Sequence, residues 1–295
     1  MTPVAVQAFA SQALPAGARA AALGVPFEAL ALHHFPDGEL MPVAPHPAAT
    51  VIVYCTLDQP NDKLVALLLA ADAWRRQGVE RLVLVAPYLC YMRQDMVFAP
   101  GQPLSRDVVG GLLGAAFDRL VTVDAHLHRT RNLSQAFGGI RTDDVSAAEP
   151  LAEALAGPER PVVVGPDAES EPWVRRIAER VGGEVLLFRK TRRGDDKVWL
   201  HAPDLSSVRG RPVILVDDIC SSGATLTVSA GLLRAARAAS IDAGVVHALF
   251  DNDTLARLKA AGIGRVVSSD AVAHPTNQAH LAKVLAKVLR DEVKA

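Results

Sequence analysis

The sequence has few cysteines, almost no net charge and no long apolar run. Its three cysteines (Cys55, Cys90 and Cys220) include no CxxC pair, which argues against a disulfide framework and for a reducing cytoplasm. A formal net charge of −1 leaves no excess of positive charge for binding nucleic acid. No apolar stretch reaches the roughly 20 residues of a membrane span, and the N-terminus lacks the basic start of a secretion signal. We therefore expect a cytoplasmic globular protein that binds neither nucleic acid nor membrane.

Apolar runs of strand length alternate with amphipathic segments that have a helical pattern. The helical patterns cover residues 63–78 and 226–240. The apolar runs are VIVY (51–54), LVLVAP (82–87), RLVTVD (119–124), PVVVG (161–165), VILVDD (213–218), VVHALF (245–250) and RVVSSD (265–270). Continuous Val/Leu/Ile strands separated by helices indicate parallel sheets that are covered on both faces. The predicted fold class is α/β.

The two halves of the chain resemble each other. At a shift of 162 residues, VIVYCT (51–56) aligns with VILVDD (213–218), as any two strand–helix units could. At a shift of 146, RLVTVDAHLH (119–128) aligns with RVVSSDAVAH (265–274), and polar residues coincide there as well. We interpret this as two related domains, 1–146 and 147–295.

The change of shift places 16 extra residues in the first half, between about 87 and 119. We assign them to an excursion over residues 88–107, which contains Pro, Gly and charge without a clear period and is available for ligand or subunit contact. The apolar and aromatic residues of 88–98 suit either burial against a partner or packing on their own domain.

Two adjacent acids, Asp217 and Asp218, close a predicted buried strand, and a run of small residues precedes the next helix. Open α/β sheets bind ligands at this carboxyl edge. The small residues offer backbone N–H groups and hydroxyls at a helix N-terminus, which suits a phosphate, while the carboxylates could accept hydrogen bonds from sugar hydroxyls or hold Mg²⁺ through water. The ordinary alternative is an N-cap, Ser221 or Ser222, after an acidic turn. The small residues are Ser221, Ser222, Gly223, Ala224 and Thr225.

The full string VILVDDICSSGATL resembles the phosphoribosyl-pyrophosphate (PRPP) binding loop of type I phosphoribosyltransferases and PRPP synthetases. Further segments are similar to the synthetases in their order along the chain: FPDGEL (35–40), YMRQD (91–95), TVDAHLH (122–128), GPDAES (165–170), RKTRR (189–193) and SSDAVAHP (268–275). Alone, most of these would be ordinary turns or exposed charged loops. Together they resemble the ribose-phosphate pyrophosphokinase family and its archaeal-type branch, which implies two tandem type I phosphoribosyltransferase-like domains, each with a mainly parallel sheet.

The resemblance implies transfer of the diphosphoryl group of Mg-ATP to the C1 hydroxyl of ribose 5-phosphate, giving PRPP and AMP. Lys190 and Arg192 would be catalytic, on a mobile segment that continues into Gly194-Asp195-Asp196. Asp217, Asp218 and residues 221–225 would bind ribose 5-phosphate, and His126 and Asp167 would contact Mg²⁺ or its waters. The implied ATP-binding residues are Phe35, Asp37, Glu39, Arg93, Gln94 and Asp95.

The family further implies a homo-oligomer whose active site is shared between subunits, with the FPDGEL segment supplied by a neighbour. Ala168-Glu169-Ser170 departs from the small residues and glycines that the family has after Asp167, and Ser221 replaces an acid common in the bacterial loop. Two other interpretations stay open. The chain could be a phosphoribosyltransferase that consumes PRPP, or a catalytically silent regulatory homologue.

Overall fold

The computed structural model describes residues 2–127, 132–157, 159–167, 170–192, 198–201 and 204–294. The chain forms two compact units, Met1–Val145 with Ala282–Ala295, and Ser146–Leu281. Their junction in the middle of the chain lies next to the predicted boundary at 146/147. The C-terminal segment differs from the prediction, because residues 282–295 pack with the first unit and not with the second.

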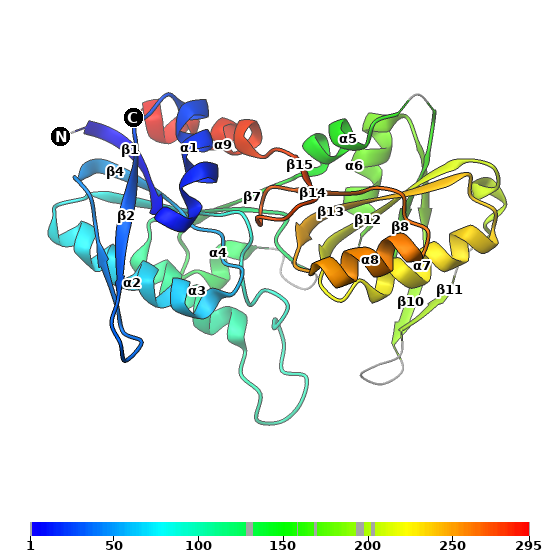
Figure 1. The fold of residues 1–295 in the computed structure, drawn as a ribbon. Helices are drawn as coiled ribbons and strands as arrows, with labels where there is room; N and C mark the ends of the chain where they lie inside the picture. Colours follow the sequence, from blue (N-terminus) through cyan, green and yellow to red (C-terminus); the bar gives the residue numbers. More distant parts are fainter. Residues whose placement is uncertain are drawn as a thin grey trace. The chain divides into compact units, whose positions relative to one another are not determined.

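The first unit is built on a seven-stranded sheet with the order β3-β2-β1-β4-β5-β6-β7, in which only the edge strand β3 runs antiparallel to its neighbour. Figure 1 shows helices α1 and α9 on one face of the sheet and α2 and α3 on the other. The strands are β1 (Thr2–Phe9), β2 (Phe27–His34), β3 (Leu40–Val43), β4 (Ala48–Tyr54), β5 (Arg81–Ala86), β6 (Arg119–Val123) and β7 (Arg141–Val145). The helices are η1 (Ala10–Gln12), α1 (Ala13–Leu23), α2 (Pro60–Arg76), α3 (Ser105–Ala116), α4 (Leu133–Ala136) and α9 (Ala282–Lys294).

Helix α9 is held on the first unit by a cluster of ion pairs at the amino ends of β5, β6 and β7. Arg119, whose side chain is 0% exposed, contacts Asp143 at 2.7 Å, Asp291 at 2.8 Å and Glu292 at 2.7 Å. Arg81 adds two hydrogen bonds to Glu292, at 2.6 and 2.8 Å. A buried guanidinium with several carboxylate partners keeps its charge compensated, so the cluster fixes the last turns of α9 against the sheet.

The second unit contains a six-stranded parallel sheet with the order β15-β14-β13-β12-β8-β9. Helices α5 and α6 lie on one face and α7 and α8 on the other (Figure 1). The strands are β8 (Val162–Gly165), β9 (Glu184–Leu187), β12 (Pro212–Cys220), β13 (Ser240–Ala248), β14 (Val266–Ser269) and β15 (Asn277–Ala279). The helices are α5 (Ala148–Leu155), α6 (Glu171–Val181), η2 (Ser206–Val208), α7 (Ala224–Ala235) and α8 (Asn252–Ala260).

An antiparallel ribbon of β10 (Arg189–Arg192) and β11 (Val198–His201) accompanies this sheet. Within the described part of the chain, no helix combines the length and apolar character that a membrane span requires. Both sheets have the α/β architecture that the continuous apolar strands predicted. Open α/β sheets bind ligands at the carboxyl ends of their strands.

Candidate active site

The loop after β12 turns tightly at Gly223, directly before helix α7. Gly223 has a φ of +71°, and a Cβ atom there would lie 2.8 Å from Cγ2 of Thr254 on α8. Only glycine meets both conditions without strain, because a side chain disfavours this left-handed conformation and would also clash. The turn therefore brings the backbone of residues 221–223 to the N-terminus of α7.

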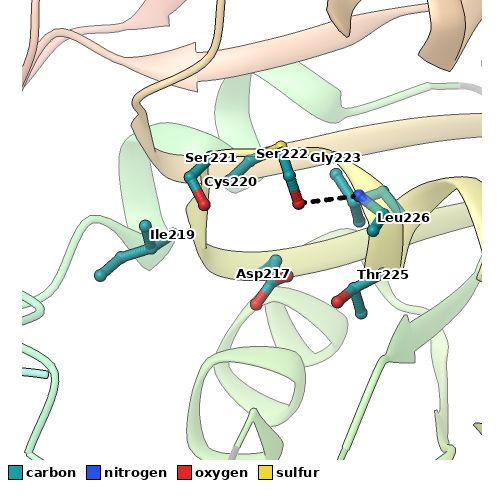
Figure 2. Close-up of a pocket in the computed structure, with 9 residues that line it drawn as sticks. Asp217, Ile219, Cys220, Ser221, Ser222, Gly223, Thr225 and Leu226 are labelled. Atoms are coloured by element: carbon teal, nitrogen blue, oxygen red, sulfur yellow. Dashed lines mark hydrogen bonds between the residues drawn. The ribbon is translucent and has the colours of Figure 1, made fainter. Parts of the chain in front are cut away.

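A pocket lies in this loop, and Figure 2 draws the polar side chains of Asp217, Ser221, Ser222 and Thr225 around it. The Ser222 hydroxyl accepts a 3.4 Å hydrogen bond from the amide of Ala224. Small polar residues at the N-terminus of a 12-residue helix form a favourable place for a phosphate dianion. The lining residues are Asp217, Ile219, Cys220, Ser221, Ser222, Gly223, Ala224, Thr225 and Leu226.

The two acids of the loop differ in their surroundings. Strand β12 continues to Cys220, two residues beyond the predicted end, so successive side chains alternate between its faces. Asp217 lines the pocket, whereas Asp218, which is 8% exposed, is absent from the lining and accepts a 2.7 Å hydrogen bond from the Ile219 amide. Asp217 thus lines the pocket, and Asp218 follows it in the same strand.

Cys220 also lines the pocket and carries a thiol group. Burial, reinforced by the nearby negative charge of Asp217, raises the pKa of this thiol to about 12. A thiol with that pKa stays protonated near neutral pH and is a poor nucleophile. Cys220 therefore lines the pocket as a small neutral side chain.

The predicted ATP segment FPDGEL forms the exposed turn of the β2–β3 hairpin, at the edge of the first unit's sheet. The amide of Phe35 donates to the Glu39 carbonyl at 2.9 Å, and the Asp37 carboxylate accepts from the Glu39 amide at 3.2 Å. Asp37 and Glu39 are both exposed. The hairpin thus presents both acids to solvent at the carboxyl edge of the sheet.

The second predicted ATP segment, YMRQD, begins in the loop after β5. Tyr91 has a φ of +63°, and its hydroxyl donates to Asn61 at the start of α2, at 2.8 Å. Arg93 is exposed and Asp95 is half-buried. The Gln94 side chain accepts a hydrogen bond from the Ser105 hydroxyl, so its carbonyl group is engaged within the protein.

The predicted Mg²⁺ ligands follow two strands in two different units, His126 after β6 and Asp167 after β8. Just before His126, Asp124 has a φ of +39°, and the Ala125 amide donates to Asp144 at 3.0 Å. Among the described residues, no three His, Cys, Asp or Glu side chains form a group that could hold a metal.

Lys190 and Arg192 lie on strand β10, whose residues pair with β11. Gly194, Asp195 and Asp196 of the predicted mobile segment lie outside the described residues, as do Ala168 and Glu169 of the predicted departure. Sequence reasoning did not single out Ile219 and Leu226, which line the pocket, nor Ser105, which holds Gln94. Ile219 and Leu226 lie within the string VILVDDICSSGATL but carry no polar group, and Ser105 lies within the 88–107 excursion, which has no clear period.

The sequence and the fold are both similar to those of known proteins. Residues 8–116 match the family described as the N-terminal domain of ribose phosphate pyrophosphokinase, and residues 146–272 match the phosphoribosyl transferase domain. The fold is similar to the phosphoribosylpyrophosphate synthetase of Mycobacterium smegmatis, with a TM-score of 0.84, 24% identity and 99% of each chain covered.

The similar curated proteins include several that are named ribose-phosphate pyrophosphokinase. The protein from Methanopyrus kandleri is 34% identical over 87% of this chain and 88% of its own length. The protein from Thermococcus kodakarensis is 31% identical over 87% of this chain and 90% of its own length. The chain therefore belongs to the ribose-phosphate pyrophosphokinase family, and it is a transferase of diphosphoryl groups.

Proposed function

We propose that the protein uses Mg-ATP and ribose 5-phosphate in the cytoplasm and releases PRPP and AMP. The observation that carries this proposal is the pocket between β12 and α7, where helix-terminal amides and hydroxyls stand beside a carboxylate. The amides and hydroxyls of residues 221–225 suit the 5-phosphate. Asp217 suits the ribose hydroxyls, because a carboxylate accepts hydrogen bonds from neutral hydroxyl donors.

The reaction exchanges one phosphorus–oxygen bond for another. The C1 hydroxyl oxygen of ribose 5-phosphate bonds to the β-phosphorus of ATP, and the bond from that phosphorus to the oxygen bridging to the α-phosphate breaks. The bridging oxygen leaves on AMP and the hydroxyl proton passes to solvent. Such a displacement needs alignment and positive charge around the transferred group more than covalent help from the protein.

Three residue groups supply these needs in the proposal. Asp37, Glu39 and Arg93 hold the nucleotide, and Lys190 and Arg192 bring positive charge to the transferred group. His126 and Asp167 bind Mg²⁺ or its waters, and when bound the ion neutralises the triphosphate. Phe35, Gln94 and Asp95 complete the nucleotide-binding segments.

We further propose that the working site is shared between two copies of the chain. The FPDGEL turn follows β2, and His126 follows β6, four strand positions away in the sheet. Neighbouring strands are about 4.8 Å apart, so roughly 19 Å of sheet separates these two strands within one unit. A hairpin supplied by a partner removes this constraint.

The outer face of the hairpin supports the same arrangement. Met41 and Val43 are 46% and 53% exposed, and their β2 neighbours in the register, His33 and Ala31, are exposed as well. Phe35 at the turn is 38% exposed. An apolar face of this kind on an edge hairpin suits burial against a second copy.

Subunit mixing tests the shared site. An Asp37→Ala/Glu39→Ala variant and a Lys190→Ala variant are each expected to be nearly inactive. Mixed under conditions in which subunits exchange, they should regain activity, because some sites combine an intact hairpin with an intact Lys190. Exchange without any return of activity would contradict the shared site.

The reaction itself is tested by measuring AMP formation from ATP and ribose 5-phosphate in the absence of a nucleobase. A PRPP-consuming phosphoribosyltransferase makes no AMP in this mixture, and neither does a catalytically silent homologue. AMP that appears only with ribose 5-phosphate supports the proposal. A folded protein that makes none refutes it.

A further inference from the structure

The loop that follows Gln94 is closed at its base by a small set of hydrogen bonds. The Gln94 side-chain oxygen accepts from the Ser105 hydroxyl, and the Gln94 carbonyl accepts from the Arg106 amide at 3.3 Å. The Gln94 amide in turn donates to the Tyr91 carbonyl at 3.1 Å. Both ends of the 95–104 loop are therefore joined through one residue, which directly follows Arg93.

Ser105 is well placed to act as the fixed end of this closure. It is the first residue of α3 and is only 9% exposed. Helix α3 lies very close to the segment that contains α4, since a Cβ atom at Gly110 or Gly114 would fall 2.1–2.2 Å from the carbonyl oxygens of Ala136 and Phe137. Such close backbone contact leaves the helix little freedom to shift.

The far end of the loop has its own separate closure. The Gln102 side-chain oxygen accepts from the amides of Phe98 and Ala99, at 3.2 and 3.0 Å. The tip is thus organised independently of the base. Loss of the Ser105–Gln94 bond should loosen the base, and with it Arg93, while the turn at the tip persists.

We infer that Ser105 is a positioning residue for the nucleotide site, acting through Gln94 to fix the backbone of Arg93. In this role the side-chain oxygen of Gln94 is bound to Ser105, while Gln94 stays within the proposed nucleotide-binding segment. The inference rests on the proposed function in one respect: Arg93 must contact ATP for the positioning to matter to catalysis.

A double-mutant cycle with Ser105→Ala, Gln94→Ala and the double variant tests this inference. Each single variant should raise KM for ATP about fivefold, the factor expected for one hydrogen bond, and leave kcat and KM for ribose 5-phosphate within twofold. The double variant should be no worse than Gln94→Ala alone, because Ser105 acts through Gln94. Ser105→Thr, which keeps the hydroxyl, should restore KM for ATP.

Hydrogen exchange supplies a readout that does not depend on activity. The Gln94 and Arg106 amides should exchange about fivefold faster in all three alanine variants and at the normal rate in Ser105→Thr. The amides of Phe98 and Ala99 should be unchanged. Ser240→Ala, at an exposed serine that begins β13, is the matched control and should alter neither measurement.

If the fold-changes of the two single variants in KM for ATP multiply in the double variant, the inference is wrong, because Gln94 then acts independently of Ser105. Normal exchange at Gln94 and Arg106 in Ser105→Ala would overturn it as well. An Arg93→Ala variant separates the two proposals. If KM for ATP is unchanged in Arg93→Ala while exchange follows the cycle, the role of Arg93 in ATP binding fails, and the hydrogen-bonded closure stands as a purely structural device.

Discussion

Replacing Arg119 by alanine should destabilise the first unit far more than the same change at Arg265 destabilises the second. The two arginines occupy equivalent positions in the repeat, each at or next to the start of a strand. Arg119 is 0% exposed, with three carboxylate partners and a further hydrogen bond to the Val288 carbonyl at 3.1 Å. Arg265 is 49% exposed and pairs with Asp242 at 2.8 Å. The two substitutions remove the same side chain from equivalent positions, so they differ mainly in the burial of the arginine.

The loss of stability in each variant depends on which carboxylates lose their arginine partner. Without Arg119, the 6%-exposed Glu292 keeps only Arg81 among the ion pairs described, and Asp143 keeps only Arg141, at 3.2 and 3.3 Å. Breaking a buried ion pair from one side costs about 3–5 kcal/mol, and the remaining arginines favour the lower end of that range. A partly exposed pair such as Arg265–Asp242 contributes about 0–1 kcal/mol.

Urea unfolding followed by Trp74 fluorescence measures the difference. Trp74 is 0% exposed in the first unit, so a Trp173→Phe/Trp199→Phe background makes it the sole reporter. With a slope of about 2 kcal/mol per molar urea, a loss of 3 kcal/mol lowers the midpoint by about 1.5 M. Far-ultraviolet circular dichroism, which reports the helices of both units, follows the unfolding of Arg265→Ala. Equal losses within about 0.5 kcal/mol for the two variants would refute the reasoning.

Three further predictions concern acid stability and the sugar-phosphate loop. Burial alone would raise the pKa of Asp291, but hydrogen bonds from Arg119 and Arg141 hold this pKa at about 2. The stabilisation from Asp291 is therefore complete above the unfolded pKa near 4 and is lost as the pH falls toward 2. Acid titration followed by Trp74 fluorescence should show this loss of stability, and the loss should be smaller in Arg119→Ala. Asp217→Asn should raise KM for ribose 5-phosphate roughly tenfold and leave ATP binding within twofold by calorimetry, whereas equal losses for both ligands would contradict its assignment to the sugar. Gly223→Ala should lower the stability by about 1–2 kcal/mol through its positive φ alone, and it should weaken ribose 5-phosphate binding. Gly231→Ala, where a Cβ meets nothing within 4 Å, is the control and should have neither effect in thermal unfolding and binding assays.

The sequence predicted the strands that are continuous apolar runs and missed those that are not. The seven predicted runs correspond to β4, β5, β6, β8, β12, β13 and β14. Strand β1, between β2 and β4 in the first sheet, was not predicted because the buried Gln7 interrupts its apolar pattern. The Gln7 amide is satisfied by Trp74 Nε1 at 2.7 Å and by the His46 carbonyl at 3.0 Å, contacts that join distant parts of the chain.

Element ends and long-range packing were also beyond the sequence pattern. The predicted helix over 226–240 stops at Ala235, because Arg237 takes a φ of +63° and strand β13 begins at Ser240. The return of α9 to the first unit depends on ion pairs such as Arg81–Glu292, between residues 211 positions apart. No local periodicity encodes a partner at that distance.

The candidate site was predictable where a motif is local. The loop after β12 and its glycine could be recognised because one stretch of chain builds the whole pocket. The excursion could not be assigned to one role: Leu89 and Met92 are buried in their own unit, whereas Met96 and Phe98 are 38% and 59% exposed. Apolar composition alone does not distinguish a residue that packs inside from one that faces solvent.

Phosphorus NMR of the purified protein with Mg-ATP and ribose 5-phosphate tests the central claim most directly, because it reports which phosphates stay together. We expect the three ATP resonances to be replaced by that of AMP and by two mutually coupled resonances of a diphosphate attached to C1. Transfer of an intact diphosphoryl group produces this pattern without ADP as an intermediate. Formation of ADP with a sugar that carries two separate monophosphates, or release of inorganic phosphate without a coupled sugar diphosphate, would contradict the account.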